Sequence, residues 1–151
     1  MGSIIPLKKS ANSAYLDLKN LLDNKLESVE KLIRLKLESN VELIKKMSDY
    51  HLGSGGKRMR ALLTMGAAKL GGYVEGSRDV NLATCVELIH SATLLHDDVV
   101  DESEIRRGIK TTNSMWGNQS SILVGDYLFS KCFEMMVEDG NLEILQLLSS
   151  A

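Results

Sequence analysis

Apolar residues recur at three- and four-residue steps along much of the chain, and lysine and glutamate separate them, as in amphipathic helices. Between residues 12 and 50 this pattern predicts two helices, with a break near Ser39 and Asn40. The apolar positions are Leu18, Leu21, Leu22, Val29, Leu32, Ile33, Leu37, Leu43, Ile44 and Met47. No segment shows strand-like alternation, so the sequence predicts an all-α fold.

Turn and cap residues divide the next part of the chain. The segment "HLGSGGKRMR", residues 51–60, predicts a loop that leads into a helix. That helix is expected to end at Gly71-Gly72, because glycine is common just beyond helix C-termini. Asp79 is a suitable N-cap for a long helix that continues to about Glu102.

The C-terminal part of the chain combines a loop with two further helices. Residues 103–118 are polar and predict a loop, and the pattern over residues 119–138 predicts a helix. Asn141 is expected to cap a last helix, "NLEILQLLSSA", whose leucines need a surface to pack against. We therefore expect residues 1–151 to be the N-terminal part of a single larger helical domain.

Composition narrows the class of protein. The chain has 151 residues, 44% of them hydrophobic and 25% charged, with 18 Lys and Arg against 20 Asp and Glu. This slightly acidic balance argues against a nucleic-acid partner. No apolar run is long enough to span a membrane, and the first ten residues lack the apolar core of a secretory signal. Cys85 and Cys132 stand apart in apolar segments and are expected to be reduced core thiols, which fits the cytoplasm.

Three aspartates gather in "LLHDDVVDESEIRRG", residues 94–108. On a helix Asp97, Asp98 and Asp101 project within an arc of about 100°, and His90 lies on the same face about two turns earlier. Carboxylates so close together repel one another, and the helix C-terminus disfavours anions. A bound Mg²⁺ would remove this conflict, because Mg²⁺ prefers hard oxygen ligands. The alternative is a solvated acidic surface.

Two basic clusters flank these aspartates in the sequence. "GSGGKRMR" places Lys57, Arg58 and Arg60 where a helix begins, and free N–H groups at a helix N-terminus favour phosphate. Arg106 and Arg107 follow the aspartates closely. Two basic clusters and one acidic cluster suit a substrate with more than one diphosphate, some held directly and some through metal. A surface turn with solvated charges is the simpler alternative for the first cluster.

Three segments, in this order, resemble the trans-polyprenyl diphosphate synthases: "GGKRMR", "ELIHSATLLHDDVVDESEIRRG" and "WGNQSSILVGDYLFSK". The resemblance covers roughly residues 50–135 and is nearest to the bacterial long-chain enzymes, of the octaprenyl and decaprenyl type, that make quinone side chains. It implies an isoprenoid-synthase helical bundle, usually a homodimer. It also implies a prenyltransferase that couples isopentenyl diphosphate to an allylic prenyl diphosphate.

The resemblance further implies roles for individual residues. Asp97 and Asp101 would coordinate Mg²⁺ on the allylic diphosphate, with Asp98 in support, and Arg106 would contact the same diphosphate. Arg58 belongs to the basic loop and is grouped with the substrate-binding residues. The isopentenyl diphosphate site would contain Lys57, Arg60, His90 and Arg107.

Part of the family pattern is missing. The family has a second aspartate-rich motif, and no DDxxD occurs between Ile109 and Ala151. We therefore expect the 151-residue chain alone to have little or no turnover.

The family pattern also bears on product length. Ala92 and Thr93 are small residues where bulky ones stop the growing tail in this family, so the tail is expected to pass them. Residues that could stop the tail further from the aspartates are Phe133, Met135, Met136 and Leu148.

Two other interpretations remain open from the sequence. The first is a metal-dependent phosphohydrolase built on "HDD", which would need His51 and His90 as further ligands. The second is a non-catalytic truncated or regulatory subunit of the same fold.

Overall fold

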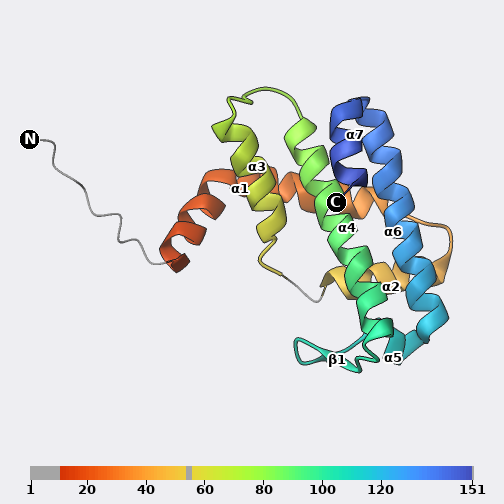
Figure 1. Ribbon diagram of the computed structural model, residues 1–151. Helices are drawn as coiled ribbons and strands as arrows, with labels where there is room; N and C mark the ends of the chain where they lie inside the picture. The colour runs from red at the N-terminus through yellow and green to blue at the C-terminus, as the bar shows by residue number, and fades with distance from the viewer. Residues whose placement is uncertain (1–10, 54–55, 151) are drawn as a thin grey trace, which may run out of the picture.

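The computed structural model describes residues 11–53 and 56–150, which form seven helices and one two-stranded hairpin (Figure 1). In chain order these are α1 (Ala11–Lys36), α2 (Glu42–Gly53), α3 (Met59–Leu70), α4 (Arg78–Val100), β1 (Ile105–Arg106), β2 (Ile109–Lys110), α5 (Thr112–Trp116), α6 (Asn118–Asp139) and α7 (Leu142–Ser149). The all-α prediction is confirmed, apart from the short hairpin. The first ten residues, where we expect no secretory signal, lie outside the described part, as do residues 54, 55 and 151.

The central helix is α4. It packs against α1, α3 and α6, and Figure 1 shows it running between α3 and α6 with α1 crossing behind. Its sequence suits this position, because apolar or small residues such as Leu88, Ala92 and Leu95 are fully buried along it. The aspartates of the acidic cluster therefore stand at the end of a helix that other helices pack against on several sides.

One hydrophobic core joins the helices. Its fully buried members come from five of them and include Val29, Ile33, Met47, Leu62, Met65, Leu88, Leu95 and Leu128. Within residues 11–53 and 56–150 no helix is both long and apolar enough to cross a membrane.

The two cysteines are free and buried in this core, as expected. They also face each other across α4 and α6. The Cys132 thiol donates to the Cys85 carbonyl oxygen over 3.6 Å. The hydrogen bond to Cys132 and burial raise the pKa of the Cys85 thiol, so this thiol stays protonated.

Several predicted helix boundaries are confirmed. Gly71 caps α3, and Gly72 follows with a positive φ of 83°. The Asn141 side chain caps α7 by accepting from the N–H groups of Glu143 and Ile144, each over 3.0 Å. These caps depend on contacts within one turn, so the local sequence is enough to predict them.

The predicted cap at Asp79 is wrong. Asp79 lies in the first turn of α4, after Ser77, whose side chain makes no capping bond. The Asp79 carboxylate is buried and forms an ion pair with Lys25 of α1, so it is drawn towards α1. The same helix ends at Val100, slightly before the predicted end, and Glu102 adopts a left-handed φ of 49°.

The prediction of a plain loop over residues 103–118 is also wrong. Ile105 pairs with Lys110 and Arg106 with Ile109, so Arg107 and Gly108 form a two-residue turn. Both turn residues have positive φ, 53° and 81°, as the right-handed twist of such a hairpin requires. Gly108 at the second turn position is a local sign of a hairpin. The strands have only two residues each, so they are too short to show the alternation of polar and apolar residues that predicts a strand.

Candidate active site

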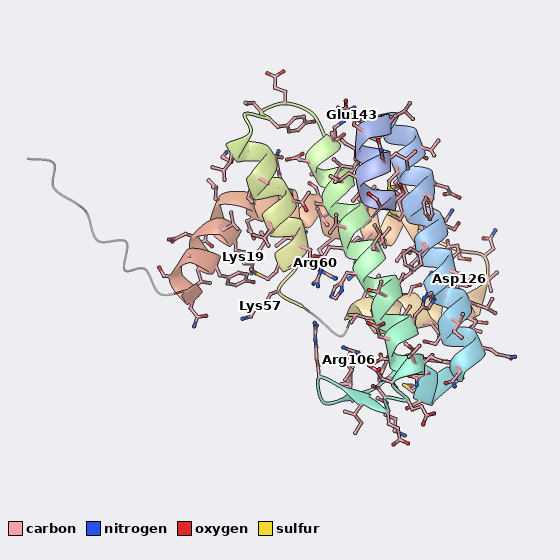
Figure 2. The ribbon with its side chains drawn as sticks, viewed as in Figure 1. Lys19, Lys57, Arg60, Arg106, Asp126 and Glu143 are labelled. Atoms are coloured by element: carbon pink, nitrogen blue, oxygen red, sulfur yellow. The ribbon has the colours of Figure 1, made fainter. Side chains whose placement is uncertain are left out.

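A cavity of about 680 Å³ lies among the end of α2, the start of α3, α4 and the hairpin. All six basic residues predicted at a substrate site line it: Lys57, Arg58, Arg60, His90, Arg106 and Arg107. Figure 2 shows Arg60 and Arg106 approaching this space from different sides, from the start of α3 and from the hairpin. Met59, Leu94 and Ile109 add apolar surface to the lining. The cavity thus combines cationic and apolar groups from segments far apart in the sequence.

Asp98 anchors the hairpin to α4. It is 2% exposed, and its Oδ1 accepts from both Nε and Nη2 of Arg106 at 2.8 Å. Its backbone carbonyl oxygen accepts from Asn113 Nδ2 over 3.1 Å. Asp98 therefore fixes the position of Arg106, and its carboxylate charge is neutralised within the protein.

Asp97 and Asp101 differ from Asp98, because both are exposed. The Asp101 N–H donates to the Asp97 carbonyl oxygen over 2.8 Å, so the two residues are one turn apart at the end of α4. Across the described residues neither carboxylate is paired with a cation. The helix thus presents two adjacent, uncompensated carboxylates, as the spacing in the sequence predicts.

These two carboxylates fit a magnesium site of the kind completed by substrate. No group of three or more His, Cys, Asp or Glu side chains is placed to hold a metal ion in the described ranges. Mg²⁺ in phosphate-handling proteins is typically held by one or two carboxylates together with substrate phosphates and water. Asp97 and Asp101 meet this requirement, whereas a site built wholly from protein ligands, as the phosphohydrolase interpretation needs, is not found there.

Two histidines line the cavity. Burial, together with repulsion from Arg106 and other nearby cations, lowers the pKa of His51 to about 4. Burial and the Arg60 guanidinium also lower the pKa of His90. Both imidazoles are therefore neutral near pH 7, and a bound anion would favour their protonation. The sequence predicted His51 only as a possible metal ligand, and its place in this cavity depends on the position of the end of α2 beside the hairpin and α4.

Tyr50 bonds the hairpin to α2 and Gly56 lies beside the hairpin tip, and neither role was predicted from the sequence. The Tyr50 hydroxyl donates to the Lys110 carbonyl oxygen over 2.8 Å, and its ring meets the edge of Trp116 at 5.2 Å. A Cβ at Gly56 would lie 3.3 Å from Arg107 Nη1. Glycine at this position therefore lets the hairpin tip approach the basic loop.

The remaining predicted residues occupy three different environments. Arg58 lines the cavity, but its guanidinium pairs with Glu30 and Glu87. Ala92 is 0% exposed and packs inside the core. Thr93 is half-buried, and its hydroxyl donates to the His90 carbonyl oxygen over 2.8 Å.

The four residues that could stop the tail further from the aspartates also differ in exposure. Met135 and Met136 are buried, Leu148 is half-buried, and Phe133 is 50% exposed. Their role in product length stays a prediction.

Residues 41–151 match the family described as polyprenyl synthetase. The chain belongs to this family. It is 44% identical over 126 residues to the octaprenyl diphosphate synthase of Escherichia coli (strain K12), which covers 83% of this chain and 39% of that protein. It is 40% identical over 145 residues to the octaprenyl diphosphate synthase of Haemophilus influenzae, covering 96% of this chain and 44% of the relative.

Solved structures of polyprenyl synthetases agree with the fold. A decaprenyl diphosphate synthase from Rhodobacter capsulatus superposes with a TM-score of 0.86 at 44% identity, covering 90% of this chain and 42% of that one. A polyprenyl synthase from Caulobacter crescentus, complexed with calcium and isoprenyl diphosphate, gives 0.86 at 40% identity, covering 90% and 41%. The family and fold predictions are confirmed. The chain spans less than half the length of these relatives.

Proposed function

We propose that this chain is the N-terminal part of a trans-polyprenyl diphosphate synthase, which joins isopentenyl diphosphate to an allylic prenyl diphosphate. The observation that carries the proposal is the cavity itself, where the six predicted basic side chains meet beside the acidic end of α4. The similarity to octaprenyl and decaprenyl diphosphate synthases supports a long product, of the kind used in quinone side chains. We further propose that the enzyme works in the cytoplasm as a homodimer.

Isopentenyl diphosphate is assigned to the side of the cavity formed by the basic loop. Lys57 supplies a point charge, and the arginines supply planar forks that match phosphate oxygens. His90, neutral when the site is empty, becomes a donor to the bound anion, because diphosphate favours its protonated form. The assigned residues are Lys57, Arg60, His90 and Arg107.

The allylic diphosphate is assigned to the end of α4. Arg106 contributes two of its five N–H groups to Asp98, so the others remain for phosphate oxygens. Asp97 and Asp101 would hold Mg²⁺, which when bound draws negative charge from the leaving diphosphate. The polyprenyl synthase from Caulobacter crescentus is complexed with calcium and isoprenyl diphosphate, which supports the use of a divalent ion.

In this proposal the chain's own residues position two substrates and balance charge. The allylic C–O bond breaks, the isopentenyl double bond attacks the allylic carbon, and a new C–C bond forms. A proton then leaves the former isopentenyl carbon and passes to the released diphosphate, so no protein base is needed. Arg106 stabilises the negative charge that accumulates on the leaving oxygen.

The test uses the complete synthase, meaning this chain joined to the rest of the domain present in its relatives. It is incubated with isopentenyl diphosphate, farnesyl diphosphate and Mg²⁺, and products are separated by chain length. Longer prenyl diphosphates are expected. Release of diphosphate without any longer product would contradict the synthase and favour a hydrolase.

The 151-residue chain is assayed beside the complete synthase. We expect little or no turnover from it, because the second aspartate-rich motif of the family does not occur between Ile109 and Ala151. Full specific activity from this chain would contradict that expectation. A complete synthase with no turnover of its own would favour the non-catalytic subunit.

A further inference from the structure

Arg58 has a backbone conformation that residues other than glycine rarely adopt. It stands just before α3 with φ 46° and ψ 39°, in the left-handed region, and its side chain makes no capping bond. Such a conformation is unfavourable outside glycine and persists where surrounding contacts enforce it. The left-handed conformation of Arg58 therefore indicates that contacts of its side chain hold it in place.

Two carboxylates on different helices hold the Arg58 guanidinium. Its Nε and Nη2 donate to Glu30 of α1 over 2.6 and 3.3 Å, and its Nη1 lies 3.6 Å from Glu87 Oε2 of α4. The Arg58 side chain is only 13% exposed, and that of Glu87 only 5%. The other oxygen of Glu87 accepts from the Ala61 N–H over 3.0 Å, in the first turn of α3.

These bonds tie the start of α3 to the helix that carries His90. Glu87 is one turn before His90 on α4, so a single buried carboxylate sets the distance between the basic loop and this histidine. The flanking residue Lys57 is exposed. Its carbonyl oxygen accepts from the Tyr15 hydroxyl over 3.4 Å, and its ammonium lies 5.6 Å from the Tyr15 ring centroid.

We propose that Glu30, Arg58 and Glu87 form a positioning clamp, the Arg58 clamp, which aims Lys57 and Arg60 at the diphosphate of isopentenyl diphosphate. Arg58 is thereby a positioning residue, in place of the substrate-binding role expected from the sequence. The left-handed turn at Arg58 directs its side chain between α1 and α4, while its neighbours on either side line the cavity. This inference rests on the proposed function for the identity of the substrate.

The clamp and simple electrostatics predict opposite effects on the binding of an anion when the charge of Glu87 is removed. Glu87 lines the cavity, so removing its negative charge should tighten the binding of an anion if charge alone mattered. The same tightening is expected if Arg58 binds diphosphate directly, because the loss of its carboxylate partner would release it. Under the clamp, removal of either carboxylate loosens the loop and weakens binding.

The experiment measures steady-state kinetics of the complete synthase with Glu87→Gln and Glu30→Gln. The glutamine at position 87 still offers an acceptor to the Ala61 N–H, and Glu30 is 37% exposed in its side chain, so both variants should fold. The matched control is Glu27→Gln, which makes the same change on the exposed surface of α1, where Glu27 pairs with Lys31. Thermal unfolding of each variant, followed by circular dichroism, verifies folding.

Both clamp variants should raise KM for isopentenyl diphosphate by about tenfold, as expected when a charged positioning bond is lost, with kcat changed less than about twofold. KM for the allylic substrate and all constants of Glu27→Gln should stay at the wild-type values. Unchanged or lower KM in folded variants would overturn the clamp. A wild-type synthase with no prenyl product would instead overturn the proposed function. Calorimetric binding of inorganic pyrophosphate then decides the clamp: weaker binding in both variants supports it, and equal or tighter binding overturns it.

Discussion

Glu87 and Asp98 lie on the same face of α4, three turns apart, and each holds an arginine from a different segment at the cavity. Eleven residues separate them, which on a helix corresponds to about 20° of rotation and about 16 Å of rise. Glu87 holds Arg58 before α3, and Asp98 holds Arg106 in the hairpin. One helix therefore sets the spacing between the two basic clusters, and the proposed binding of two diphosphates depends on this spacing.

Replacing either exposed aspartate should abolish activity without harming the fold. Asp97→Asn or Asp101→Asn in the complete synthase is expected to lower kcat/KM at least about 100-fold, because each replaces a charged carboxylate, the proposed ligand of Mg²⁺, with a neutral amide. Both side chains are exposed, and their mutual repulsion destabilises the helix end, so Tm should stay equal or rise. Glu104→Gln, an exposed acid in the following loop, is the control and should keep full activity. Retained activity in both aspartate variants would argue against the metal site.

Asp98→Asn should instead destabilise the protein. This change removes the charge of a buried carboxylate that accepts two N–H groups of Arg106, whose side chain is 36% exposed. Breaking such a partly exposed pair is expected to lower the free energy of unfolding by about 1–3 kcal/mol. Thermal unfolding of Asp98→Asn beside Asp97→Asn provides the matched comparison, since the same change is made at neighbouring residues. Equal Tm values would contradict the anchoring role of Asp98.

Tyr50→Phe tests whether the hairpin must be held in place. The variant keeps the ring contact with Trp116 and removes the hydroxyl that donates to Lys110. We expect KM for the diphosphate substrates to rise about three- to tenfold, in line with the loss of one hydrogen bond, with a smaller change in kcat. Tyr127→Phe removes a comparable hydroxyl bond, to the Glu38 carbonyl oxygen over 3.3 Å, and should leave KM unchanged. Equal effects of the two variants on KM would contradict a role for the Tyr50–Lys110 hydrogen bond in substrate binding.

His51 should make stability depend on pH below neutrality. Its pKa is about 4 in the folded protein and 6.5 in its ordinary state, so the unfolded chain binds more protons between these values. The protonation of His51 therefore costs no stability above about pH 6.5, and the free energy of unfolding decreases as the pH falls towards 4, by ~3 kcal/mol in all. Chemical denaturation at several pH values should show a flatter profile for His51→Gln. Parallel profiles for wild type and variant would show that His51 does not titrate in this way.

The sequence predicted the features that depend on neighbouring residues. The helix boundaries at Gly72 and at Asn141 follow from contacts within one turn. The projection of Asp97 and Asp101 follows from the helical period. The prediction at Asp79 failed because Lys25, from a distant part of the chain, pairs with the carboxylate. Local propensity does not contain that contact.

The candidate site shows the same limit. The family motifs named the basic residues that line the cavity, but they did not separate Arg58, held by two carboxylates, from its neighbours. Tyr50 and Glu87 carry no chemical motif in the sequence. Their roles depend on partners brought near by packing, Lys110 for Tyr50 and Arg58 for Glu87.

Ala92 and Thr93, the two neighbouring residues predicted to influence product length, lie in different environments. Ala92 is 0% exposed within the core, so Ala92→Phe must insert a ring into packed side chains, at a cost of about 1–3 kcal/mol or more. That variant should lose stability whether or not it shortens the product. Thr93 is half-buried and lies one turn before Asp97, about 40° from its line on the helix.

Thr93→Phe is therefore the sharper test of a tail that runs along α4 away from the aspartates. The added ring should stop elongation early, while the first condensation keeps a near-normal rate because the predicted metal and diphosphate ligands are untouched. Thr93→Val is the matched control, since it keeps the volume and removes only the hydroxyl bond to the His90 carbonyl oxygen. Chromatography of the products of both variants gives the answer. Unchanged product length in a folded, active Thr93→Phe enzyme would place the tail elsewhere, because a ring in its path must block it.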